Sequence, residues 1–254
     1  MRDYDTLIRR ISNISRIQSL VIGRLESGHP IYGVTSGTGD KKVILSSGIH
    51  GDEPAGVEAI LRFLEGYGDS LNAGIQRWEK AYQFTVFPCT NPTGYERGTR
   101  ENACGIDLNR RFGSKKGPPE EVAIIQRALK GQQFVLYMDF HEDTDGEGFY
   151  LYEVLYEEKD HLAEEIIESI SHRYPIDLRE SIDGFPNCGG VICPQRDEKR
   201  FPFKRVDLPL PLYLYLHGVR HCFTIESPTR LPMEDRVGMH LMALETVLNR
   251  YVLL

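Results

Sequence analysis

The chain has 254 residues, of which 41% are hydrophobic, and its formal net charge at pH 7 is -7. This length and composition suit one large α/β domain with a sizeable core, and we expect a single domain over residues 1–254. The acidic balance, with a sequence pI of about 5.7, argues against nucleic acid as a partner, because a nucleic-acid surface needs a basic stripe. The nearest basic cluster is short and is interpreted as a solvated loop: Lys199, Arg200, Lys204 and Arg205.

Membrane and export signals are absent from the sequence. No stretch reaches the roughly 18 apolar residues of a membrane span, and the N-terminus has no signal-peptide apolar segment. We therefore expect a cytoplasmic protein that has no membrane partner. The cysteines are odd in number and scattered, so we predict reduced, mostly buried thiols and no disulfide framework.

Predicted helices and strands alternate in the first half of the chain. Apolar spacing predicts an amphipathic opening helix over residues 4–17. It is followed by strands at 20–22 and 31–34, a strand ending at 47, a helix over 54–66 and a strand at 84–87. Residues 89–117 form a long polar loop punctuated by glycine. A loop of this length inside a compact domain is usually functional or disordered.

The second half continues the alternation. A helix opens at Pro118, and the segments after it read as strands at 134–140, 149–155 and 221–225 and helices at 160–173 and 233–251. Strands that alternate with helices are typical of the α/β class. The predicted fold is a three-layer α/β/α sandwich around a mixed, largely parallel sheet.

His50 and Glu53 follow the apolar run 43–45 and precede the predicted helix at 54–66, so they lie at a strand-to-helix turn. Imidazole nitrogen and carboxylate oxygen are good Zn²⁺ donors, and a catalytic zinc typically takes three protein ligands. The same pair also occurs in ordinary solvated turns. A second histidine at another strand end is the feature that favours a metal site.

That histidine is His141, directly after the apolar strand 134–140. Residues at the carboxyl ends of parallel strands meet in one crevice, so His141 completes a set of two histidines and one carboxylate with His50 and Glu53. Glu226 follows the strand at 221–225 and is suited to general base and then general acid catalysis. Alone, each of these residues reads as an ordinary strand-end or surface side chain.

The long loop carries further polar groups: Arg97, Arg100, Asn109, Arg110 and Arg111. Arginine forks bind carboxylates and stabilise a developing oxyanion, so a loop of this kind near zinc suits an anionic substrate. The alternative is that these side chains serve solubility, which is our interpretation of Arg97 and Arg111.

Five short motifs occur in a fixed order: HGDE at 50–53, NPTG at 91–94, GTRENACGIDLNRRF at 98–112, FH at 140–141 and TIESP at 224–228. Together they resemble the ordered motifs of the zinc carboxypeptidase (M14) family over roughly residues 42–230. The loop wording is most similar to the bacterial murein-peptide amidases. The HGxE form also resembles the branch of succinylglutamate desuccinylase and aspartoacylase.

The resemblance implies one zinc ion and three ligands: His50, Glu53 and His141. Glu226 matches the catalytic acid/base that acts on the zinc-bound water. Arg100 matches the arginine that polarises the scissile carbonyl, whereas Asn109 and Arg110 match the pair that grips the substrate carboxylate. Asp107 matches a group that fixes this loop.

The leading functional hypothesis is a zinc-dependent metallopeptidase that hydrolyses an amide bond next to a free carboxylate on a small peptide. One alternative is an N-acyl amino-acid deacylase of the aspartoacylase or succinylglutamate desuccinylase type. The other is a catalytically silent binding domain, which is disfavoured because every matched position holds the expected residue type. The expected partner is a small peptide or an N-acyl amino acid with a free carboxylate.

Two features leave alternatives open. Digestive carboxypeptidases place a mobile tyrosine between the second histidine and the final glutamate, and here Tyr174 and Tyr213 are weak candidates. An acidic run follows His141: Glu142, Asp143, Asp145 and Glu147. It either meets a cationic group on the substrate or forms a solvated loop, since charge runs usually face water.

Overall fold

A mixed eight-stranded sheet lies at the centre of the computed structural model, with strand order β1-β2-β4-β3-β5-β10-β6-β9. The structure describes residues 2–67, 73–114, 117–155, 161–194 and 207–252, so the basic cluster at 199–205 lies outside the described residues. The strands are β1 Gln18–Arg24, β2 Pro30–Ser36, β3 Lys41–Ser47, β4 Tyr82–Phe87, β5 Leu136–Asp143, β6 Tyr150–Leu155, β9 Val191–Ile192 and β10 His221–Pro228. A separate hairpin pairs β7 Ser181–Ile182 with β8 Phe185–Pro186.

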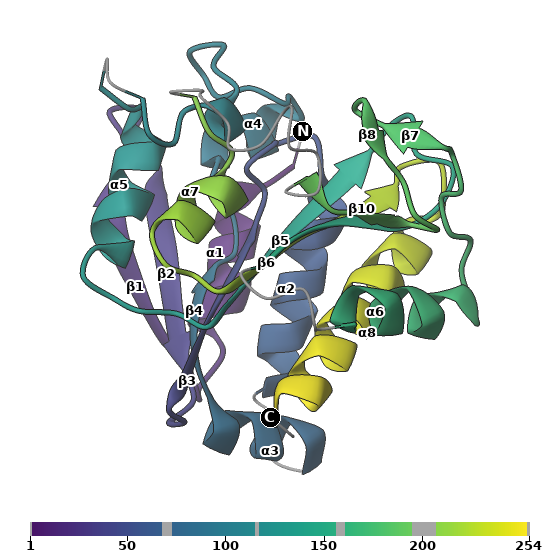
Figure 1. Ribbon diagram of the computed structural model, residues 1–254. Helices are drawn as coiled ribbons and strands as arrows, with labels where there is room; N and C mark the ends of the chain where they lie inside the picture. The colour runs from purple at the N-terminus through teal and green to yellow at the C-terminus, as the bar shows by residue number, and fades with distance from the viewer. Residues whose placement is uncertain (1, 68–72, 115–116, 156–160, 195–206, 253–254) are drawn as a thin grey trace.

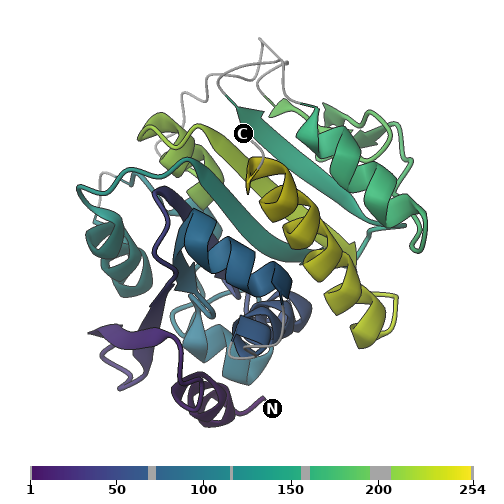
Figure 2. The ribbon, with the colours of Figure 1, turned by 90° about the horizontal axis from the view of Figure 1, so that it is seen from below.

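Helices cover both faces of the sheet (Figure 1). They are α1 Tyr4–Ser12, α2 Pro54–Tyr67, α3 Ala73–Ala81, α4 Pro92–Arg97, α5 Glu120–Leu129, α6 Leu162–Ser171, α7 Leu210–Leu216 and α8 Met233–Val252, with a 3-10 turn at Leu108–Arg110. Helices α2, α6 and α8 pack on one face, and Figure 2 shows α6 and α8 side by side. Helices α5 and α7 pack on the other face. Helix α5 contacts β1, and α7 contacts β5, β6 and β10.

Two apolar cores result from this layering. The core on the α2, α6 and α8 side includes Leu45, Met138 and Phe223, which are fully buried. The core on the α5 and α7 side includes Ile44, Tyr137 and Cys222. Neighbouring residues of one strand thus enter opposite cores, as the two-residue period of a β-strand requires.

Strand register brings the candidate site residues into rows on one face. Ser46 of β3 pairs with Asp139 of β5, which pairs with Thr224 of β10. Two residues further along, His141 pairs with Glu226, and Glu226 pairs with Tyr150 of β6. Side chains two residues apart on a strand share a face, so the second row extends the first toward the carboxyl ends of β5 and β10.

The predicted fold class is confirmed, because the four central strands β4, β3, β5 and β10 are mutually parallel and β1, β2 and β6 join antiparallel. Strands β5 and β10 run to Asp143 and Pro228, so His141 and Glu226 lie inside their strands, not after them as predicted. The opening helix ends at Ser12, earlier than predicted.

Three short α-helices were not predicted. Helix α7 has the sequence Leu210-Pro-Leu-Tyr-Leu-Tyr-Leu216, which is apolar throughout and shows no helical period. Helix α3 is only nine residues long, and the polar loop 89–117 contains the six-residue α4. Short helices depend on tertiary packing more than on their own periodicity.

The cysteine prediction is correct in part. None of the five cysteines forms a disulfide bond, but only Cys89 and Cys222 are buried, whereas Cys104 and Cys188 are exposed. Within the described ranges, no helix has the length and apolar character needed to cross a membrane.

Candidate metal centre and active site

A tight turn between β3 and α2 presents His50 and Glu53. Gly48 has a φ of +62°, and a Cβ added there would lie 2.9 Å from Val57 Cγ2, so the turn needs glycine at this position. The amide of Glu53 donates to the carbonyl of His50 at 3.3 Å, and Pro54 begins α2. This compact turn directs both side chains to the same side.

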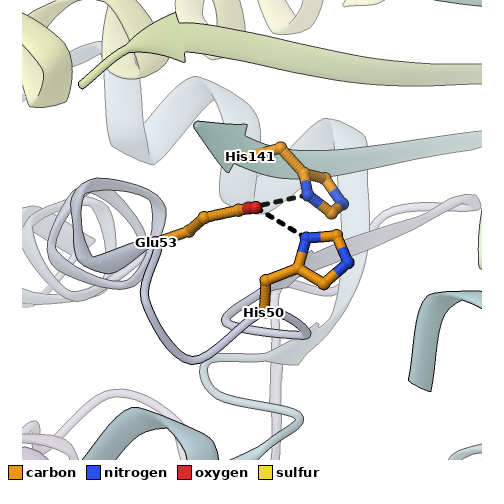
Figure 3. Close-up of side chains that lie close together, drawn as sticks. All are labelled: His50, Glu53 and His141. Atoms are coloured by element: carbon orange, nitrogen blue, oxygen red, sulfur yellow. Dashed lines mark hydrogen bonds and ion pairs between the residues drawn. The ribbon is translucent and has the colours of Figure 1, made fainter. Parts of the chain in front are cut away.

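His50, Glu53 and His141 converge as predicted (Figure 3). His50 Nδ1 lies 2.6 Å from Glu53 Oε1, and His141 Nδ1 lies 2.8 Å from Glu53 Oε2. One donor atom from each residue lies within 4.8 Å of the others, and all three residues are buried. This group could hold a metal ion.

A carboxylate lies behind each imidazole. His50 Nε2 is 3.3 Å from Asp107 Oδ1, and His141 Nε2 is 3.1 Å from Asp139 Oδ2. Asp139 also accepts a 2.6 Å hydrogen bond from Ser46 Oγ, and its exposed fraction is 0%. A carboxylate on the far nitrogen orients a metal-binding histidine and raises its basicity. Both Nδ1 atoms therefore remain directed at Glu53.

Charges in the centre are strongly coupled. Burial opposes the charged form of Glu53, but His141 and His50 outweigh it and hold the pKa of Glu53 well below its usual value. Burial likewise opposes the charged form of His141, and the carboxylates of Glu53 and Asp139 raise its pKa well above the usual value. The centre thus favours an ionised Glu53 next to positively charged histidine. A bound cation would likewise place positive charge next to Glu53.

Glu226 lies beside the group on β10, in register with His141. Burial raises its pKa well above the usual value; His141 opposes this shift, and the negative charges of Glu53, Asp143 and Asp139 add to it. A raised pKa makes a carboxylate a stronger base than an ordinary glutamate. The predicted acid/base residue therefore has a suitable position and environment.

Arg100 faces the donor atoms from the long loop. Its Nη1 is 3.2 Å from His50 Nδ1 and 3.6 Å from Glu53 Oε1. Its Nε and Nη2 each donate to Asp107 Oδ2 at 3.2 Å. Burial opposes the charge of Asp107, but its contact with His50 and the nearby arginines keep its pKa well below the usual value. Asp107 therefore links Arg100 of the long loop to His50.

Asn109 and Arg110 lie on the 3-10 turn after Asp107. Asn109 is buried, and its Oδ1 accepts a 3.0 Å hydrogen bond from the amide of Leu210 at the start of α7. Arg110 is exposed, and its Nη1 donates to the carbonyl of Asn109 at 2.9 Å. Among the charges that lower the pKa of Asp107, those of His50 and Arg100 act more strongly than that of Arg110.

Asn91 connects two segments of the candidate site, and the sequence did not reveal this connection. It is fully buried and caps α4, accepting from the amide of Gly94 at 2.9 Å. Its Nδ2 donates to the carbonyls of Ile49 and Arg100 at 3.2 and 3.4 Å. Asn91 thus links the turn before His50 to the segment that carries Arg100. Asparagine followed by proline is a typical start of a helix, and this signal could have placed α4.

Tyr150 is the tyrosine beside Glu226, and the sequence did not identify it. Its hydroxyl donates to Asp143 Oδ2 at 3.1 Å. Burial, and then the charge of Glu226, raise the pKa of Tyr150, so it keeps its proton. The candidates Tyr174 and Tyr213 lie elsewhere: Tyr174 packs closely on Gly238 of α8, and Tyr213 stacks at 4.1 Å on His217.

The acidic run after His141 does not act as one unit. Glu142 is 5% exposed, forms an ion pair with Arg236 and accepts a 2.6 Å hydrogen bond from the amide of Ala55. Asp143 Oδ2 lies 3.2 Å from Arg179 Nη2. The prediction that these side chains form a single solvated or substrate-facing loop is therefore wrong for Glu142, which is part of the interior.

The mixed α/β sheet carries, within the described part of the chain, a buried group of two histidines and one glutamate that could hold a metal ion. The chain belongs to the zinc carboxypeptidase family, whose profile matches residues 3–190. This family is zinc-dependent, and the nitrogen and oxygen donors of His50, Glu53 and His141 fit that ion.

Individual relatives include a carboxypeptidase and a succinylglutamate desuccinylase. Carboxypeptidase SOL1 of Arabidopsis thaliana is 29% identical over 120 residues, which are 44% of this chain and 23% of that protein. Succinylglutamate desuccinylase of Vibrio campbellii is 31% identical over 107 residues, 42% of this chain and 28% of that protein. The matched segments thus span less than a third of either relative. A candidate metallopeptidase from Shewanella denitrificans OS217 shares the fold, with a TM-score of 0.80, 20% identity, and coverage of 99% of this chain and 92% of that chain.

Proposed function

We propose that this chain is one catalytic domain that binds a single zinc ion and hydrolyses an amide bond next to a free carboxylate. The observation that carries the proposal is the convergence of three predicted ligands, His50, Glu53 and His141, within 4.8 Å, with Glu226 in register beside His141. Zinc at these donors would supply Lewis-acid polarisation of a carbonyl and a lowered pKa for water.

Glu226 acts as the general base and then the general acid. Its raised pKa suits it to take a proton from the attacking water and to return that proton to the leaving amine. The neighbouring Tyr150 stays protonated and is held by Asp143, so Glu226 is the group on this row that accepts the proton.

Arg100 stabilises the charge that develops on the scissile carbonyl oxygen. Its guanidinium reaches the donor atoms of His50 and is held in position by Asp107. A preorganised cation at the position of a developing oxyanion lowers the barrier because it needs no reorganisation during the reaction. Asp107 therefore serves the site twice, by orienting both His50 and Arg100.

Asn109 and Arg110 bind the free carboxylate of the substrate. The exposed guanidinium of Arg110 has a fork geometry that matches a carboxylate. The hydrogen bond between Asn109 Oδ1 and the amide of Leu210 fixes the orientation of the side-chain amide. This leaves the NH₂ end of Asn109 as the donor for the substrate.

Deacylation of an N-acyl amino acid is a second candidate, because the succinylglutamate desuccinylase of Vibrio campbellii is 31% identical over 107 residues. A substrate panel of C-terminal dipeptides, γ-glutamyl peptides and N-acyl amino acids separates the two. Release of an amino acid from peptides supports the peptidase, and release of acetate or succinate supports the deacylase. Zinc-loaded protein that cleaves none of these would contradict both.

A further inference from the structure

Two of the chain segments that build the candidate centre meet at α4. The turn 48–53 carries His50 and Glu53, and the loop after α4 carries Arg100 and Asp107. A Cβ on Gly51 would lie 1.9 Å from the carbonyl carbon of Gly94, so the backbones of the turn and of α4 are in direct contact. A change in this contact would move His50 and Glu53 relative to Arg100 and Asp107.

Arg2 lies across this junction. Its Nη1 donates to the carbonyl of Gly51 at 2.6 Å and to that of Tyr95 at 3.5 Å, and its Nη2 donates to the carbonyl of Asp52 at 3.5 Å. Gly51 and Asp52 are the two residues between His50 and Glu53. The guanidinium therefore contacts the backbone that joins the two candidate ligands.

The charge of Arg2 suits this position. The carbonyls of Tyr95 and Glu96 belong to the last turn of α4, where helix carbonyls point outward and favour a cation. The backbone amide of Arg2 donates to the Glu96 carbonyl at 3.3 Å, and the guanidinium carbon lies 5.5 Å from the ring centroid of Tyr95. Charge-assisted hydrogen bonds of this kind are stronger than neutral ones.

We propose that Arg2 is a positioning residue for the active centre. By holding the carbonyls of Gly51 and Asp52 against the end of α4, it fixes how far His50 and Glu53 lie from Arg100 and Asp107. The expected change in zinc affinity rests on the proposed metal site. The contact between the turn and α4 exists in the metal-free chain, so it can be tested without zinc.

Helix α1 has its own attachments, and these supply a matched control. Arg10 pairs with Glu58 and Glu65 of α2, with N–O distances of 2.6 and 2.7 Å. The hydroxyl of Tyr4 donates to the carbonyl of Pro30 at 2.8 Å. Arg10→Ala loosens the attachment of α1 without removing a contact to the ligand turn.

The test compares Arg2→Ala, Arg2→Lys and Arg10→Ala with the wild type. Zinc affinity is measured by competition with a chelator, and amide hydrogen exchange of the metal-free proteins is followed over residues 48–53 and 97–107. We expect Arg2→Ala to weaken zinc binding roughly tenfold and to speed exchange in both segments. Arg2→Lys keeps the charge but replaces the guanidinium with one ammonium group, so we expect an intermediate loss of zinc affinity. Arg10→Ala should match the wild type.

Two results would overturn the inference. One is unchanged zinc affinity and exchange in Arg2→Ala. The other is an equal loss in Arg10→Ala, which would show that general attachment of α1 is sufficient. Failure of the wild type to bind zinc would instead contradict the proposed function, and the exchange data on the metal-free proteins would still decide the role of Arg2.

Discussion

His141 and Glu226 are register partners on the parallel strands β5 and β10. The pairing of the two strands fixes the distance between a predicted metal ligand and the predicted acid/base residue, and no loop intervenes. Backbone hydrogen bonds in the centre of a sheet are among the most stable parts of a fold. The relative position of these two side chains is therefore preorganised before substrate binds.

Glu226→Gln should keep the metal and lose turnover. Glutamine preserves the size of the side chain but cannot exchange a proton, so we expect kcat to fall roughly 10²- to 10⁴-fold with zinc content unchanged. Metal analysis and steady-state kinetics on the same preparation test this. Glu147→Gln, which changes an exposed carboxylate of the acidic run, is the control and should retain wild-type kcat. Full activity of Glu226→Gln would contradict the proposed role.

Asp139→Asn should weaken metal binding because it removes the charge behind His141 Nε2. We expect a roughly tenfold loss of zinc affinity, measured by chelator competition. Glu153→Gln is a matched control, because Glu153 is also a buried carboxylate paired with a histidine, 2.7 Å from His221 Nε2. It should alter stability and leave zinc affinity unchanged. Equal losses in the two variants would show that the effect is general destabilisation.

Arg100→Ala should lower kcat at saturating zinc by roughly 10²- to 10³-fold, the usual cost of removing an oxyanion donor. The measurement is kcat and KM on the best substrate from the panel. Arg97→Ala is the control, since Arg97 makes an exposed 3.4 Å hydrogen bond to the carbonyl of Ala103. If Arg100→Ala raises KM alone, Arg100 contributes to substrate binding and not to stabilisation of the transition state.

His240→Gln should make the free energy of unfolding depend less steeply on pH below neutrality. Burial lowers the pKa of His240 from 6.5 to about 3, with a further contribution from His141. An unfolded histidine takes up a proton below its usual pKa, so the stability contributed by neutral His240 is complete above about pH 6.5 and is lost as pH falls toward 3. The free energy of unfolding of the wild type should fall by up to about 1.4 kcal/mol per pH unit in this window.

Denaturant titrations of metal-free protein between pH 7 and pH 4 test that prediction. The control is Ser227→Ala, because Ser227 Oγ lies 3.0 Å from His240 Nε2 and its loss leaves the titrating group in place. This variant should be less stable than the wild type with the same dependence on pH. Parallel profiles for His240→Gln and wild type would show that His240 does not contribute to acid sensitivity.

The convergence of the predicted metal ligands could be anticipated from the sequence because each follows an apolar run. His50, Glu53 and His141 needed only the rule that parallel strands end in one crevice. Asp139 could have been found in the same way, since residues two apart on a strand share a face. Its apolar neighbours instead made it read as part of a buried strand.

Other parts of the site depend on tertiary pairing that the sequence does not encode locally. Tyr150 lies beside Glu226 only because β6 pairs with β10, and strand order cannot be read from apolar spacing. Arg2 and Gly51 are separated by 49 positions and meet through the packing of α1 on α2 and α4. Tyr174, which the sequence offered as a candidate, lies in the core.

Zinc titration of chelator-treated protein is the most direct test of the central claim that His50, Glu53 and His141 hold one catalytic zinc ion. We predict that stripped protein is inactive toward the panel substrates and that one equivalent of Zn²⁺ restores turnover. His50→Ala and His141→Ala should fail to recover at the same zinc concentration. Full turnover by the stripped wild-type protein, or recovery of both histidine variants, would contradict the account.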